Sequence, residues 1–184
     1  MSKFNNILII GLGMMGASLA LASKSKGIKV YGHDSDSSAV ELAKKENFIN
    51  ESFDSLEEIN NKSLSDRIDL VIVCVPPRQT QEVFNNIREL WNTPITITDT
   101  SSVKNHLKVN DVDNIILSHP IAGSDRSGLS AADSKLYIDK KNIICDPFKA
   151  NSMHLNRLID FWESAIQMRT SVTVSYTHLR AHET

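Results

Sequence analysis

The sequence is poor in cysteine, which small extracellular folds use to compensate for a small core. Its two cysteines, Cys74 and Cys145, each lie in an apolar run typical of a buried strand. This placement fits reduced thiols in a cytoplasmic protein better than a disulfide framework. A chain of 184 residues buries about 70% of its unfolded surface, so it needs no covalent or metal staple. We therefore expect no metal site and a cytoplasmic location.

Concentrated positive charge is also lacking. The 20 Lys and Arg residues are balanced by 22 Asp and Glu residues, which leaves a formal net charge of −2. No long run of Lys or Arg occurs. Because nucleic acids and anionic membrane surfaces attract concentrated positive charge, this composition argues against either partner.

The sequence contains no apolar run long enough to span a membrane. Residues 7–22 carry no charge, and this segment ends in small residues that imitate a signal-peptide cleavage site. It is shorter than the roughly 20 residues of a membrane span, and three glycines interrupt it. Cleavage there would also remove the first predicted strand. We expect neither a signal peptide nor a membrane partner.

Short apolar runs alternate with helical patterns along most of the chain. A weak amphipathic stripe covers residues 39–43, and a strong one extends from Val83 to Trp91. This alternation predicts an α/β fold, a doubly wound, mostly parallel sheet of the Rossmann type, over residues 1–150. The predicted strands are residues 7–10, 28–32, 70–75, 95–98, 115–117 and 143–145.

A glycine-rich motif links the first predicted strand to a helix. The motif is Gly11-Leu12-Gly13-Met14-Met15-Gly16. Gly11 permits a tight turn, Gly13 lets backbone N–H groups approach a pyrophosphate, and Gly16 lets the helix lie close to the sheet. The N-terminus of the helix then faces the phosphates with its partial positive charge. The alternative is that these glycines form only a turn.

An acidic residue follows the second predicted strand. Asp34 comes 18 residues after Gly16, close to the spacing at which a carboxylate binds the adenosine ribose. Residues 35–38 contain no Lys or Arg, and the carboxylates of Asp34 and Asp36 would repel a 2′-phosphate. The pattern favours NAD over NADP as cofactor. The alternative for Asp34 is a simple helix cap.

Two polar loops follow later strands, at the edge where open α/β sheets bind ligands. The first, residues 98–104, also permits a structural interpretation, because Asp99, Thr100 and Ser101 are all plausible caps of a short helix through Leu107. Taken alone, this loop favours the structural interpretation.

The second loop, residues 118–128, contains His119 followed by Pro120. Proline biases His119 toward an extended backbone, so we expect its imidazole at the carboxyl tip of a strand, facing the cofactor. An ordinary imidazole pKa of about 6.5 suits a general base. A lone histidine is more often structural, but its position beside a nucleotide site favours catalysis.

The order of these motifs resembles the N-terminal domain of the prephenate/arogenate dehydrogenases of tyrosine biosynthesis. The resemblance covers about residues 5–168 and is carried by GLGMMG, GHDS, VCVPP, DTSSVK, SHPIAGSDRSG and LYIDKKNIICDP. It implies NAD-dependent oxidative decarboxylation of prephenate to 4-hydroxyphenylpyruvate, or of arogenate to tyrosine. His119 would accept the proton of the ring hydroxyl, Ser102 would orient both groups, and Lys104 would support the loop.

The resemblance also implies which other residues contact the ligands. The substrate loop would include Lys104, Gly123, Ser124 and Asp125, and the family often has Glu at the last position. The cofactor-binding residues would be Gly11, Leu12, Gly13, Met14, Met15, Gly16, Asp34, Val75, Pro76 and Asp99.

The C-terminal part departs from the repeating pattern. Asn151 or Ser152 can cap a helix, and no further strand is expected. The family continues into a helical domain that forms a homodimer and supplies a substrate-binding arginine. Residues 151–170 would begin the helix that leads there. Residues 171–184 have no sustained period, and we interpret them as a disordered or frame-shifted tail. Resequencing the locus tests this hypothesis.

Two alternatives remain open. The chain can be another Rossmann dehydrogenase that acts on a small hydroxy acid, or a non-catalytic NAD-binding module.

Overall fold

A parallel sheet of five strands forms the centre of the computed structural model, which describes residues 3–61, 67–91, 95–104, 107–109, 113–123, 126–145 and 150–173. The spatial order is β3-β2-β1-β4-β5. The chain therefore starts in the middle and winds outward in both directions, as the doubly wound prediction requires. The strands are β1 (Asn6–Ile10), β2 (Lys29–His33), β3 (Glu51–Ser52), β4 (Leu70–Val73) and β5 (Thr96–Asp99).

A second sheet continues from β5 and consists of β6 (Leu117–Ile121), β7 (Lys141–Cys145) and β8 (Arg169–Thr173). A parallel bridge between Ile97 and Ile115 joins the two sheets just before β6. β7 is antiparallel to β6, and β8 is parallel to β7. The prediction of a mostly parallel sheet is confirmed, but the reversal at β7 was not foreseen, because an apolar run indicates burial and not direction.

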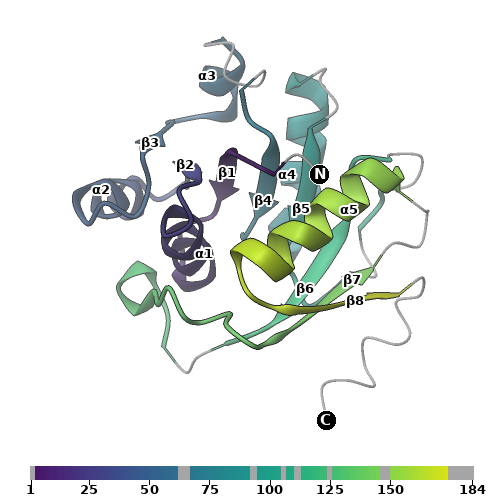
Figure 1. Ribbon diagram of the computed structural model, residues 1–184. Coiled ribbons are helices and arrows are strands. Elements are labelled where there is room, and N and C mark those ends of the chain that lie inside the picture. Colours follow the sequence, from purple (N-terminus) through teal and green to yellow (C-terminus); the bar gives the residue numbers. More distant parts are fainter. Residues whose placement is uncertain are drawn as a thin grey trace.

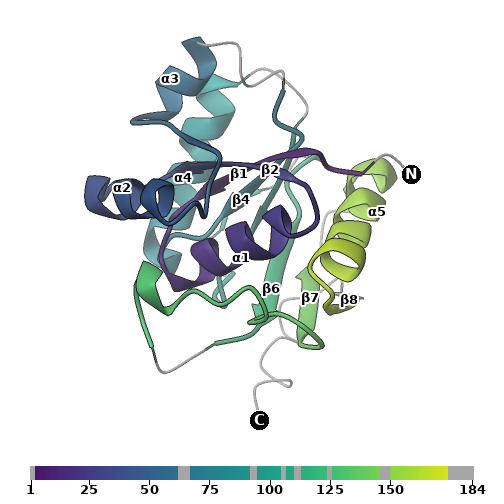
Figure 2. The same ribbon diagram turned by 60° about the vertical axis from the view of Figure 1, so that its left-hand side comes forward.

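Helices cover both faces of the sheet (Figure 1). One core cluster joins the sheet to α1 (Met14–Lys24), α2 (Ser37–Lys45) and α5 (Ser152–Asp160). The other joins it to α3 (Leu56–Asn61) and α4 (Pro77–Leu90). Alternate residues of β1 supply the two clusters: Ile7 and Ile9 face the first, whereas Leu8 and Ile10 face the second. Figure 2 shows α1 and α5 on the side away from α4.

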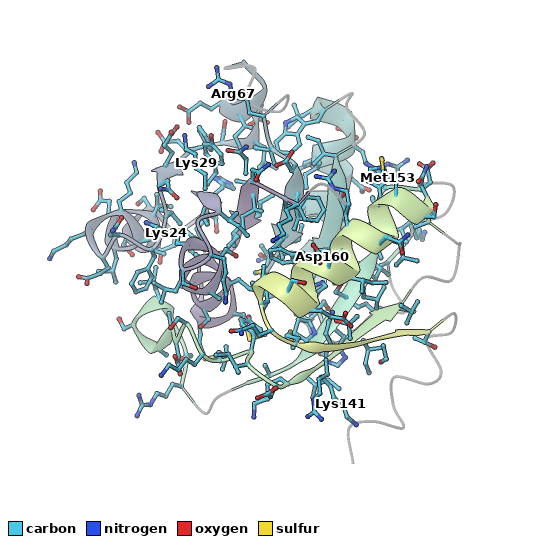
Figure 3. All side chains as sticks on the ribbon, in the orientation of Figure 1. Lys24, Lys29, Arg67, Lys141, Met153 and Asp160 are labelled. Atoms are coloured by element: carbon cyan, nitrogen blue, oxygen red, sulfur yellow. The ribbon has the colours of Figure 1, made fainter. Side chains whose placement is uncertain are left out.

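Local capping explains where several helices begin. The side chain of Asp36 caps α2 by accepting a hydrogen bond from the Ser38 backbone nitrogen at 2.9 Å. Asn151 caps α5 in the same way through the Met153 nitrogen at 2.9 Å, as the sequence predicted. Figure 3 shows Met153 and Asp160 toward opposite ends of α5, and Met153 is 55% exposed.

The C-terminal segment departs from the sequence prediction. α5 packs into the first core cluster through Leu158, and a π-helical turn, η2 (Phe161–Ala165), follows it directly. Gln167, with φ of 64°, then turns the chain into β8. The structural unit thus extends past the predicted boundary at residue 150, and residues 171–173 of the predicted tail belong to β8. Residues 174–184 lie outside the described residues.

The sequence missed β8 because the strand is polar. Its residues Arg-Thr-Ser-Val-Thr contain one apolar side chain, and three of the five are exposed. An edge strand of this kind has no apolar run or strict alternation to reveal it. In the part of the chain that the structure describes, no helix has both the length and the apolar character needed to cross a membrane.

Candidate nucleotide and substrate cleft

A cleft of about 770 Å³ opens at the carboxyl ends of the strands. Residues that follow β1, β2, β4 and β5 line it together with residues of β6. The structure therefore brings together the two polar loops and the glycine motif, which lie far apart in the sequence. The predicted site residues that line the cleft are Gly11, Gly13, Met14, Met15, Asp34, Val75, Pro76, Ser102 and His119.

The three glycines of the motif differ in how much space surrounds their α-carbons. Gly11 has φ of 96°, and a Cβ there would lie 2.8 Å from the Cys74 carbonyl carbon and oxygen. A Cβ at Gly16 would lie 1.9 Å from the Gly11 carbonyl oxygen. At Gly13 no atom lies within 4 Å of a Cβ position. The first and third glycines thus permit close packing, whereas Gly13 leaves open space in the cleft that a pyrophosphate fits.

The first turn of α1 is held in place from outside the motif. The buried Tyr137 donates a hydrogen bond from its hydroxyl to the Met15 carbonyl oxygen at 2.8 Å. Ser18 Oγ accepts a hydrogen bond from the Asp133 backbone nitrogen at 3.0 Å. Gly13 begins α1 without a side-chain cap. The positive N-terminal end of the helix is therefore not covered by a capping side chain and can face an anion.

Asp34 fastens the end of β2 to the glycine loop. Its Oδ2 accepts a hydrogen bond from the Leu12 backbone nitrogen at 2.6 Å, and its Oδ1 accepts one from Asp36 at 2.9 Å. The helix-cap alternative is wrong for Asp34, because Asp36 caps α2. A carboxylate has about four acceptor sites, so Asp34 retains capacity for ribose hydroxyls. Leu12 is buried and contributes its backbone N–H to this link.

Asp99 and Lys104 form a buried ion pair with Oδ2 and Nζ 2.5 Å apart, and neither side chain is exposed. Burial lowers the pKa of Lys104, and the Asp99 charge opposes this shift. Asp99 was predicted to contact the cofactor, but in the structure its carboxylate bonds within the protein. Its oxygens accept from Lys104, from the Ser101 nitrogen at 3.1 Å and from the Ser118 nitrogen at 3.2 Å, and Asp99 does not line the cleft.

The loop after β5 presents Ser102 to the cleft. Ser102 is exposed, whereas Ser101 is buried and bonds to the backbone of Val103. Residues 100–104 form no helix, so the short capped helix considered from the sequence is absent from this described segment. Asp99 Oδ2 accepts from the Ser101 nitrogen and from Lys104 Nζ, so one carboxylate oxygen joins both ends of this irregular segment.

His119 lies within β6 and is 7% exposed. The backbone is extended, as Pro120 predicted, but the strand continues to Ile121, so His119 is not at its tip. The imidazole nevertheless reaches the cleft, which Ser102 also lines. The cleft therefore contains both an imidazole and a hydroxyl, the two kinds of group that proton transfer to or from a bound hydroxyl can use.

Both cysteines are free. Cys74 is half-buried and lines the cleft, and burial raises the pKa of its thiol to about 12. The thiol is therefore protonated near neutral pH and is not a nucleophile. Among the described residues, no group of three or more His, Cys, Asp or Glu side chains could hold a metal ion.

The loop after β6 differs in part from the prediction. Gly123 is exposed and does not line the cleft, and Ser124 and Asp125 lie outside the described residues. Arg126 lines the cleft and was not singled out from the sequence. The sequence could have indicated Arg126 as a ligand-binding residue, because it lies between Gly123 and Gly128 in a loop expected to bend around a ligand.

A doubly wound sheet whose glycine loop, ribose-type carboxylate and helix N-terminus share one cleft defines a Rossmann-type nucleotide-binding domain. Comparison with known protein families identifies the family of this domain. Residues 18–169 match the family model described as "Prephenate dehydrogenase, nucleotide-binding domain". The chain belongs to this family.

Individual relatives agree with this family. A cyclohexadienyl dehydrogenase of Zymomonas mobilis is 28% identical over 170 residues, which cover 89% of this chain and 56% of the relative. A prephenate dehydrogenase of Lactococcus lactis is 34% identical over 140 residues, 71% of this chain and 38% of the relative. The chain thus spans about half the length of these relatives or less.

A solved structure of a prephenate dehydrogenase has the same fold as this chain. The prephenate dehydrogenase of A. aeolicus in complex with hydroxyphenyl propionate and NAD+ superimposes with a TM-score of 0.84 at 27% identity. The match covers 94% of this chain and 60% of that one. An arogenate dehydrogenase of Synechocystis has the same fold, with a TM-score of 0.82 at 20% identity.

Proposed function

We propose that this chain is the nucleotide-binding part of an NAD-dependent dehydrogenase that oxidises and decarboxylates prephenate or arogenate. The observation that carries the proposal is that the glycine loop, Asp34 and His119 open into one cleft. The A. aeolicus relative supports it, because its complex contains both NAD+ and a phenol-bearing acid.

The cofactor would lie along the glycine loop. The open space at Gly13 and the uncapped N-terminus of α1 fit a pyrophosphate. Asp34 would accept hydrogen bonds from the ribose hydroxyls while it keeps its bond to Leu12. Its charge would repel a 2′-phosphate, which favours NAD over NADP. Val75 and Pro76 line the cleft beyond β4 and would contact the nicotinamide half.

The chemistry assigned to this chain is proton transfer. When bound, NAD+ would supply the hydride acceptor for the carbon that bears the substrate hydroxyl. His119 accepts the hydroxyl proton, and Ser102 orients that hydroxyl by a hydrogen bond. The bond to the ring carboxylate breaks, carbon dioxide leaves, and the electron pair of that bond completes the aromatic ring. Loss of carbon dioxide leaves a phenolate, and His119 returns the proton to its oxygen. The products are a phenol, carbon dioxide and NADH, with His119 neutral again, so charge and electrons balance.

Arg126 is the proposed partner of a substrate carboxylate. It lines the cleft together with Ser102 and His119, and a guanidinium forms strong, oriented hydrogen bonds to carboxylates. The other predicted residues of the substrate loop, Gly123, Ser124 and Asp125, stay proposed substrate contacts.

The activity of the whole protein is expected to need more than this chain. Because the chain spans 56% of the Zymomonas relative, we expect the isolated chain to turn over weakly. Positioning of substrate supplies several kcal/mol of barrier reduction, and part of that positioning belongs to the remaining length. We further propose a cytoplasmic homodimer for the complete protein, which cell fractionation and light scattering test.

The deciding experiment uses the purified chain. Titration calorimetry with NAD+ tests the cofactor site, and prephenate- or arogenate-dependent formation of NADH tests the reaction. We expect NAD+ binding, weak turnover, and loss of that turnover in His119→Asn. Absence of NAD+ binding would contradict the proposal.

Two outcomes would favour the alternative functions. NAD+ binding without turnover of prephenate or arogenate, also after the chain is extended to the length of its relatives, indicates a non-catalytic NAD-binding module. Turnover of other small hydroxy acids alone indicates a different dehydrogenase of the same fold.

A further inference from the structure

Ser118, the residue before His119 in β6, is held by side chains at both of its backbone polar atoms. Its N–H donates to Asp99 Oδ1 at 3.2 Å, and its carbonyl oxygen accepts from Lys104 Nζ at 2.7 Å. Both contacts are buried. Because ionised partners strengthen hydrogen bonds in a buried site, the ion pair fixes the backbone next to His119.

The hydroxyl of Ser118 is held as well. Thr98 Oγ1 lies 2.8 Å from Ser118 Oγ, and Trp162 Nε1 donates to the same oxygen at 3.1 Å. All three side chains are fully buried. One serine thus joins the end of β5, the strand β6 and the turn after α5.

These side-chain contacts connect β5 and β6 where the two strands share no backbone hydrogen bonds in the described structure. In the described structure, β5 and β6 are joined by a single bridge at Ile97 and Ile115, with backbone bonds from Ile97 to Asn114 and from Ile116 to Ile97, each at 2.9 Å. These bonds lie before Ser118. Past them, side chains hold β6 beside β5 at the point where it carries His119.

Trp162 comes from an unusual element. It lies in the π-helical turn η2, where the Ile166 nitrogen bonds to the Phe161 carbonyl at 3.0 Å. π-Helical turns inside or after α-helices are rare and occur frequently at functional sites. Here the turn carries the indole that reaches the strand of His119.

We propose that Ser118 and Trp162 are positioning residues for His119. Neither lines the cleft, so they act through the strand and not through a ligand. The proposal rests on the proposed function in assigning proton transfer to His119. It adds that the segment of α5 and η2 sets the orientation of the imidazole through a hydrogen bond to the preceding residue.

The test measures how fast diethyl pyrocarbonate acylates each of the six histidines, with the sites separated by mass spectrometry. The variants are Ser118→Ala, Trp162→Phe and their combination. The matched control is Trp91→Phe, because Trp91 is also buried, at 6% exposed, but belongs to the opposite core cluster. His154, at 5% exposed, serves as an internal reference for a buried histidine.

We expect both single variants to raise the acylation rate of His119 about threefold or more, because a loosened strand opens locally. Trp91→Phe should leave it unchanged. The double variant should be no faster than the faster single one, because both changes remove the same hydrogen bond. Ser118→Thr keeps the hydroxyl and should retain the wild-type rate. Should Ser118→Ala fail to fold, Thr98→Val removes the other bond to the hydroxyl.

An unchanged His119 rate in either single variant overturns the proposal. So does an equal rise at His119 and His154, which indicates general loosening. A second readout is affinity for ligands: both variants should weaken binding of hydroxyphenyl propionate and leave NAD+ affinity unchanged. If the wild-type chain binds neither, the proposed function fails, while the acylation rates still decide this inference.

Discussion

The Thr96 hydroxyl oxygen and the His154 Nδ1 lie 2.7 Å apart in the buried layer between β5 and α5. Thr96 is 1% exposed and His154 is 5% exposed. The contact satisfies two polar groups inside the domain and fastens α5 to the sheet. It also places a titratable ring where a positive charge is costly.

This contact predicts that stability depends on pH. Burial lowers the pKa of His154, Asp113 raises it, and Arg157 lowers it further. Below its ordinary pKa of about 6.5, the unfolded chain binds a proton that the folded chain does not. Stability should therefore fall as the pH drops from about 6.5 toward the folded pKa, by at most about 1.4 kcal/mol per pH unit from this group.

Urea unfolding at a series of pH values checks this dependence. The matched variant is His154→Asn, which keeps a polar group near Thr96 but does not titrate. Its stability should fall less steeply between neutral pH and pH values near 5. Equal slopes in the two proteins would show that His154 does not contribute.

The glycine loop gives a second prediction, in which two substitutions of the same kind have different effects. Gly16→Ala places a Cβ 1.9 Å from the Gly11 carbonyl oxygen, which should destabilise the fold by about 3 kcal/mol, the upper end of the usual cost of overpacking. Gly13→Ala meets no atom within 4 Å, so the fold should persist while NAD+ binding weakens. Thermal unfolding and calorimetry measure the two effects. A stable Gly16→Ala protein would show that α1 can shift away from the loop.

A third prediction concerns the choice of cofactor. Asp34→Ala removes the carboxylate proposed for the ribose hydroxyls and should weaken NAD+ binding about tenfold, equivalent to about 1.4 kcal/mol. NADP+ should be affected less, because the same change removes a repulsive charge. Asp36→Ala is the control, since it removes the cap of α2 and leaves the bond between Asp34 and Leu12. Unchanged NAD+ affinity in Asp34→Ala would exclude Asp34 from the ribose site.

The buried ion pair leads to a fourth prediction. Lys104→Met leaves the Asp99 carboxylate buried without its cation and should cost about 3–5 kcal/mol. In the double variant with Asp99→Asn, the amide oxygen can still accept from the Ser118 nitrogen and no unpaired charge remains. The double variant should therefore be more stable than Lys104→Met alone in urea unfolding. Additive losses would contradict this account of the pair.

The sequence was most informative where one side chain or its absence fixes the local backbone. The glycine motif predicted a turn at Gly11, an open position at Gly13 and a close contact at Gly16, and the three residues have these geometries. Both cores are built from short apolar runs, so most strands were predictable. The family followed from the order of the motifs and was confirmed by the match over residues 18–169.

Roles that depend on distant partners were not predictable. The carboxylate of Asp99 was visible in the sequence, but its partner Lys104 is reached through an irregular loop that no periodicity describes. Trp162 and Ser118 are 44 residues apart, and each has an ordinary place in its own apolar stretch. β8 was hidden because its side chains are polar and exposed.

The position of α5 also has a consequence for synthesis of the protein. The ring of Phe4 packs edge-on against Phe161 at 6.1 Å between centroids, so the two ends of the described chain meet in one core. When only the first five strands of the nascent chain have emerged from the ribosome, the residues that cover that core have not yet been synthesised. Contacts between such distant residues slow folding. We therefore expect this domain to complete its fold only after β8 has emerged from the ribosome.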